Sequence, residues 1–259
     1  MKYRSGFLVA LLVVAIICLS FFDPIPQSLE YHGFADTRSW LGIANFGDVM
    51  SNVPYALAGG VGLWAIFGAA GRNWFVQPAD RWPYIIFFTG VALVGAGSAY
   101  YHLAPGNERL VWDRLPMTIA FMALFAAFIA DRIDRRIGTY WLLPLLVAAG
   151  ILSVAYWAWT EALGRGDLRW YAIVQFYPIV ALPIICWLFP GGRYTTGRHL
   201  AWLLAWYVVA KVLEHFDASV LNLLGNTISG HALKHVASGL AALVVIRMLA
   251  SRYETGTEL

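Results

Sequence analysis

Charged residues are scarce in this sequence. Aspartate, glutamate, lysine and arginine together make up 13% of the 259 residues, whereas soluble globular chains carry about 25%. So low a charge content excludes a disordered chain, a coiled coil and an ordinary soluble domain. The net charge is +3 without any basic stripe, so no nucleic-acid partner is expected.

Cysteine is equally rare. The two cysteines, Cys18 and Cys186, each lie within an apolar run, which excludes a disulfide scaffold and favours inert packing roles for both. Apolar side chains are correspondingly frequent: they form 60% of the residues, and the mean hydropathy is +0.64. This composition predicts an all-α, polytopic transmembrane helical bundle.

Eight runs are long and apolar enough to span a membrane, since a spanning helix needs about 20 residues. The first run, residues 6–22, also has the basic start of a signal peptide, but residues 19–24 are a poor cleavage site, so a retained anchor is favoured. The other runs cover residues 49–70, 82–103, 110–130, 139–160, 170–189, 200–216 and 230–250.

Basic and acidic residues alternate between successive loops. Because lysine and arginine concentrate in cytoplasmic loops, both termini are expected in the cytoplasm, and a bacterial inner membrane is the expected location. The basic positions are Lys2, Arg4, Arg72, Arg81, Arg132, Arg135, Arg136, Arg193, Arg198 and Arg252, and the acidic outer ones are Asp23, Glu30, Asp36, Asp48, Glu161 and Asp167.

A few polar residues lie at the ends of three runs. Ser98 and His102 are four residues apart at the end of the third run, and His231 and His235 have the same spacing at the start of the last. Residues four apart share a helix face. Asp113 opens the fourth run. Because the third run leads outward and the fourth and last lead inward, all five residues are expected at one depth near the outer surface.

Ionisable groups in membrane spans are costly and usually functional. Three imidazoles are the ligand set of a catalytic zinc site, with Asp113 as a supporting partner or a base. Two of the histidines could instead ligate a haem, and each residue alone could be an ordinary interfacial side chain. His32 and His199 fall between the runs and are expected at the surface.

Two further features have simple explanations. Glu214, His215 and Asp217 either support or gate the pocket, or belong to an ordinary helix end where Lys211 pairs with Glu214 three residues on. Small residues punctuate the second and third runs, which predicts close helix packing. They are Gly59, Gly60, Gly62, Gly90, Gly95 and Gly97.

The order and spacing of the polar motifs resemble those of the alkaline ceramidase family. That family belongs to a superfamily of seven-span membrane hydrolases that includes the adiponectin and progestin receptor-like proteins. The resemblance covers the second to eighth runs and implies an anchor helix over residues 1–24 and a seven-transmembrane catalytic domain over 25–259. It rests on Ser51-Asn52, Gly97-Ser98-x-x-x-His102, Asp113-x-x-Pro116-Met117 and His231-x-x-x-His235.

The resemblance implies a zinc-dependent amidohydrolase that cleaves ceramide or a related N-acyl lipid to a free fatty acid and an amine lipid. By the same resemblance His102, His231 and His235 bind zinc, and Ser98 and Asp113 complete the catalytic site.

The family also carries an acidic, calcium-binding cluster before its first core span. The matching stretch here contains Asp36, Asn45 and Asp48 without a run of ligands, so calcium is not expected, and the choice between ceramide and another N-acyl lipid stays open.

Three other functions compete with a hydrolase. The chain could be a lipid or fatty-acid receptor in which zinc is structural, or a haem-binding electron-transfer protein. A transporter is disfavoured, because no inverted repeat is visible and the charged residues cluster at one surface instead of the midplane.

Overall fold

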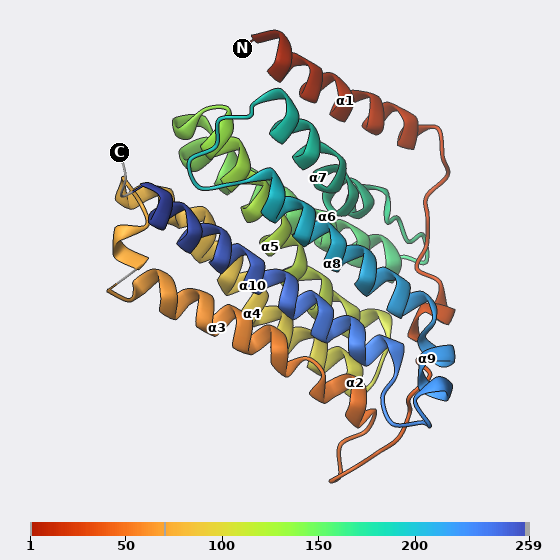
Figure 1. Ribbon diagram of the computed structural model, residues 1–259. Helices are drawn as coiled ribbons and strands as arrows, with labels where there is room; N and C mark the ends of the chain where they lie inside the picture. Colours follow the sequence, from red (N-terminus) through yellow and green to blue (C-terminus); the bar gives the residue numbers. More distant parts are fainter. Residues whose placement is uncertain (1, 70, 257–259) are drawn as a thin grey trace.

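The computed structural model describes residues 2–69 and 71–256, which form a bundle of long helices running side by side (Figure 1). These residues contain no strand, and seven of their helical segments are long and apolar enough to cross a membrane. The predicted all-α class is confirmed, and the chain has the architecture of a multi-pass membrane protein.

Although a turn at residues 51–52 interrupts the second run, each of the eight predicted runs corresponds to a long helix. Short elements join them: α2 (Phe46–Met50), α9 (Asp217–Leu223), three 3₁₀ turns (Leu29–His32, Gly71–Asn73 and Pro78–Arg81) and a π-helical turn (Ile137–Leu142) that leads into α6. The long helices in the described ranges are α1 (Lys2–Ser20), α3 (Val53–Phe67), α4 (Trp82–Leu103), α5 (Asn107–Arg132), α6 (Leu143–Ala162), α7 (Arg169–Leu188), α8 (Gly197–His215) and α10 (Gly230–Gly256).

Helix α8 differs from the other long helices. It carries Arg198, Lys211 and Glu214 within 19 residues, and it is not among the seven segments apolar enough to span on composition alone. It nevertheless lies within the bundle and packs along α10 (Figure 1). Of its three charged side chains, Glu214 pairs with Lys234 of α10, whereas Arg198 and Lys211 are exposed.

The core of the bundle surrounds α5, whereas α1 lies at the edge beside α7 (Figure 1). In the most apolar stretch of α5, 67% of residues are buried, against 6% for α1. Two polar contacts attach α1: the Tyr177 hydroxyl donates to the carbonyl of Leu8 at 2.7 Å, and Arg4 donates to the carbonyl of Leu188 at 2.8 Å. Helix α1 is thus a peripheral addition to the other helices.

Glycines bring α3 and α4 into close contact. A Cβ atom added at Gly59 would lie 2.4 Å from the backbone nitrogen of Ala92, and one at Gly95 would lie 2.9 Å from that of Ala56. The predicted close packing is confirmed at these positions. The prediction of close packing is wrong for Gly60, where an added Cβ would meet open space.

The two ends of the bundle differ. Helix α1 begins and α10 ends at the same end, while α2 and α9 lie at the opposite end (Figure 1). Helix α4 ends, and α5 and α10 begin, near α2 and α9. We call this the site end, because it brings together the polar motifs of α4, α5 and α10.

Candidate metal centre

Three buried histidines meet at the site end. His102 comes from the last turn of α4, and His231 and His235 come from the first two turns of α10. One ligand nitrogen from each ring lies within 4.8 Å of the other two. The three imidazoles are therefore close enough to bind one metal ion, as the spacing of the motifs predicted.

The closest pair is His102 and His231, whose Nε2 atoms lie 3.2 Å apart. Two nitrogens bound to one tetrahedral zinc are about 3.3 Å apart, given Zn–N distances of about 2.0–2.1 Å. The Nδ1 atom of His102 is buried without a hydrogen-bond partner among the described residues. The polar contacts of this ring are thus confined to the histidine cluster, where a cation would satisfy the facing lone pairs.

The third ring, His235, is oriented by Ser51 in the break between α2 and α3. The Ser51 hydroxyl lies 2.8 Å from Nδ1 of His235 and donates to the carbonyl of Asp48 at 3.0 Å. Because a hydroxyl has one proton, Ser51 accepts from the N–H at Nδ1. This tautomer leaves the Nε2 lone pair of His235 free for a metal.

Two further contacts hold the helix ends that carry the histidines. The side chain of Asn45 donates to the carbonyl of His102 at 2.8 Å, and the carboxylate of Asp217 accepts from the backbone N–H of His231 at 2.8 Å. The ring of Phe34 packs against His102 and His231 at centroid distances of 4.7 and 4.3 Å. These three contacts position and enclose the cluster.

The acidic residues before α3 are partly engaged in contacts outside the histidine cluster. Asp36 pairs with Arg38 at 2.6 Å, and the hydrogen bond from this guanidinium lowers the pKa of the Asp36 carboxyl. Asp48 is fully buried, and one of its oxygens accepts from the hydroxyl of Ser229 at 3.1 Å. The other Asp48 oxygen is buried without a hydrogen-bond partner among the described residues, and the amide of Asn45 is turned toward α4.

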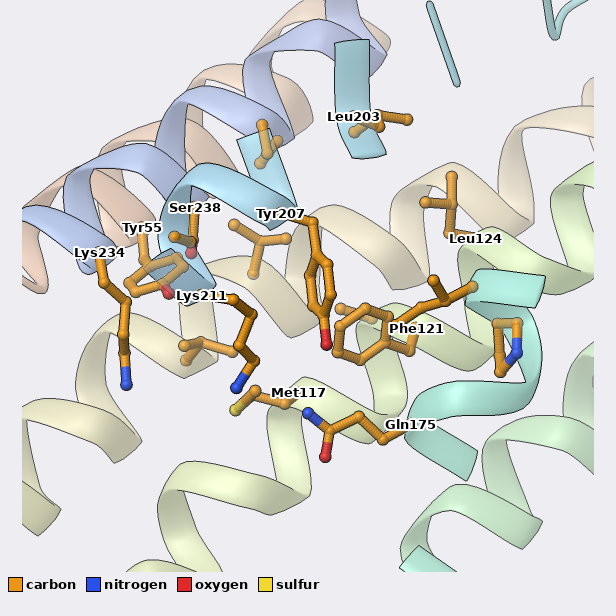
Figure 2. A pocket seen from close by; sticks show the side chains of 18 of the residues that line it. Tyr55, Met117, Phe121, Leu124, Gln175, Leu203, Tyr207, Lys211, Lys234 and Ser238 are labelled. Atoms are coloured by element: carbon orange, nitrogen blue, oxygen red, sulfur yellow. The ribbon is translucent and has the colours of Figure 1, made fainter. Parts of the chain in front are cut away.

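An apolar cavity of about 380 Å³ extends from the cluster between α4, α5, α7, α8 and α10 (Figure 2). Ser98, Asp113 and His235 all line it. His102 and His231 are not among its lining residues. The cavity therefore reaches the three histidines through His235.

The expectation of a surface position is wrong for His199 and holds in part for His32. His199 is buried in the first turn of α8, where its ring nitrogen lies 2.6 Å from the capping hydroxyl of Thr196. His32 is half-buried, with ring nitrogens 2.8 Å from the hydroxyl of Tyr101 and 2.8 Å from Asn107. A capping contact accompanies the burial of the His199 ring, and cross-loop contacts hold the half-buried ring of His32; apolar runs reveal neither.

The polar residues around the end of α8 have separate roles. Glu214 pairs with Lys211 at 2.6 Å, as the spacing predicted, and also with Lys234 of α10 at 2.7 Å. These three side chains line the cavity. His215 is exposed, and Asp217 holds the start of α10.

Comparison with models of known protein families and with curated proteins gives no match for this chain. The resemblance to the alkaline ceramidases therefore rests on the motifs themselves. The histidines of these motifs meet at the site end, and His235, Ser98 and Asp113 share the adjoining cavity.

Proposed function

We propose that this chain is an integral-membrane, zinc-dependent amidohydrolase that cleaves the amide bond of ceramide or a related N-acyl lipid, releasing a free fatty acid and an amine lipid. One observation carries the proposal: the cavity that holds Ser98 and Asp113 reaches the three-histidine cluster through His235. A metal site, a carboxylate and a hydroxyl beside an apolar chamber are the parts that lipid amide hydrolysis requires.

The donor set fits zinc. His102, His231 and His235 would hold the ion, because three neutral imidazoles with an open fourth position are typical of catalytic zinc. The 3.2 Å spacing of two Nε2 atoms and the Ser51-fixed tautomer of His235 support this assignment. When bound, zinc would polarise the amide carbonyl and lower the pKa of a bound water to about 7.

Asp113 and Ser98 provide the remaining chemistry. The Asp113 carboxylate would accept a proton from the attacking water while the water oxygen bonds to the amide carbonyl carbon. The C–N bond then breaks, and Asp113 returns the proton to the leaving amine nitrogen. Ser98, one turn before His102 and in the same cavity lining as Asp113, would orient the carboxylate and donate to the developing oxyanion.

The cavity fits an acyl chain. Its volume of about 380 Å³ lies in the usual range for small-molecule sites. Phe121, Leu124 and Leu203 lie along its apolar part (Figure 2). An acyl chain seated there would exclude water from the polar end.

The test is turnover of a ceramide with a fluorescent acyl chain by the purified chain in nonionic detergent. The wild type and a His199→Ala variant, which changes a buried histidine remote from the site, are expected to release fatty acid. His231→Ala is expected to release none. Equal turnover by His231→Ala and the wild type would refute the proposal, whereas bound lipid without turnover by any form would favour a receptor.

A further inference from the structure

The cavity beside the histidine cluster carries more positive than negative side chains. Lys211, Lys234 and Arg114 line it together with two carboxylates, Glu214 and Asp113. Three cations and two anions leave an excess of one positive charge. Because unbalanced charge in a membrane bundle is costly, this excess points to an anionic ligand.

The two lysines are held as a pair. Each ammonium binds a different oxygen of Glu214, at 2.6 Å for Lys211 and 2.7 Å for Lys234. An ammonium has three N–H donors, so each lysine keeps donors beyond this contact. Figure 2 shows both ammonium groups pointing the same way.

Arg114 adds a second source of unused donors. Its side chain is only 5% exposed, and its guanidinium lies over the rings of Trp157 and Tyr171 at 4.4 and 4.7 Å. One terminal nitrogen donates to Gln27, whereas the other has no hydrogen-bond partner among the described residues. None of the ion pairs formed within the described ranges includes this guanidinium.

We propose that the ligand of this cavity is an anionic amphiphile: an N-acyl lipid whose polar part carries a carboxylate or a phosphate that binds Lys211 and Lys234. Its acyl chain occupies the apolar part of the cavity, and its anionic group offsets excess positive charge among the lining side chains. The N-acyl linkage rests on the proposed function, but binding does not depend on hydrolysis. Glu214 is then a positioning residue that holds the two ammonium groups together.

Equilibrium binding to the full chain in phosphatidylcholine nanodiscs tests this inference with three probes of equal chain length. N-palmitoylglycine carries a carboxylate, hexadecyl phosphate carries a phosphate, and N-palmitoylethanolamine is neutral. Using His231→Ala alongside the wild type separates binding from turnover. At least one anionic probe is expected to bind about tenfold or more tightly than the neutral one, and the tighter of the two identifies the head group. Equal affinity for all three probes would overturn the inference.

Variants locate the anion. Lys211→Gln and Lys234→Gln are each expected to weaken anionic binding about tenfold while neutral binding stays constant, and Lys234→Arg is expected to keep the preference. Arg165→Gln, which removes an exposed cation from a loop at the site end, is the matched control. Binding of the neutral probe shows that a variant is folded. If Lys234→Gln no longer binds the neutral probe, Lys211→Gln and the preference of the wild type for anionic probes still test the inference.

The two proposals fail separately. Hydrolysis of neutral ceramide without any preference for anionic probes would overturn the anionic ligand alone. A preference for anionic probes without hydrolysis of any N-acyl lipid would overturn the amidohydrolase alone.

Discussion

Ser51→Ala removes the hydroxyl that orients His235 and leaves the three imidazoles in place. The Ser51 Oγ–His235 Nδ1 distance is 2.8 Å, and the same hydroxyl donates to the carbonyl of Asp48. Removing such an orienting partner from a metal-binding histidine typically costs 10–100-fold in metal affinity. The variant is therefore expected to bind zinc more weakly and to keep its fold.

The structure places the effect at the lower end of that range. Only one of the three ligands loses an orienting contact, because Asn45 and Asp217 still hold the backbone of His102 and His231. We expect about a tenfold loss of zinc affinity, which corresponds to about 1.4 kcal/mol.

Competition with a chelator of known affinity measures this loss. Ser51→Thr keeps a hydroxyl and is expected to bind zinc within about threefold of the wild type, because the acceptor is conserved. Ser153→Ala is the matched control, since it removes another hydroxyl, one that bonds only within α6, to the carbonyl of Gly150. Unchanged zinc affinity in Ser51→Ala would refute the assigned tautomer and orienting role.

Two stability predictions follow from other parts of the bundle. Gly59→Ala would place a Cβ 2.4 Å from the backbone of Ala92 and is expected to lower the unfolding midpoint, at a cost of about 1–3 kcal/mol. Gly60→Ala, whose Cβ meets open space, is expected to leave the midpoint unchanged. Equal unfolding midpoints for the two variants would contradict the close packing of α3 on α4. The pKa of Asp36 is lowered from 3.8 by Arg38, so this pair stabilises the fold above that value and its contribution is lost as the pH falls through the lower, folded pKa. Arg38→Gln should therefore reduce the midpoint difference between neutral pH and about pH 3, and an unchanged difference would count against the pair.

The helices and the meeting of the three histidines follow from simple regularities. Apolar length marks the spans, and the alternating direction of successive spans determines which ends share one depth. The i, i+4 spacing of His231 and His235 places both on one face of α10. These two regularities predict that the three histidines lie at one depth, whereas their meeting also depends on how α4 is rotated toward α10.

Contacts between helices depend on information that spacing does not carry. How each helix is rotated about its axis decides that Ser51 meets His235 and that Lys234 meets Glu214. The burial of His199 depends on Thr196, whose capping hydroxyl starts α8 before its apolar run begins. Ser51 stood out in the sequence only as part of the resemblance, which does not indicate its hydrogen bond.

The metal content of the purified protein tests the central claim most directly. Elemental analysis of the wild type and of His102→Ala, His231→Ala and His235→Ala, each dialysed against the same trace-zinc buffer, compares all four forms. The predicted result is one zinc per wild-type chain and loss of that zinc from each variant that stays folded. A folded wild type without zinc, or a variant that keeps a full equivalent, would contradict a three-histidine zinc centre.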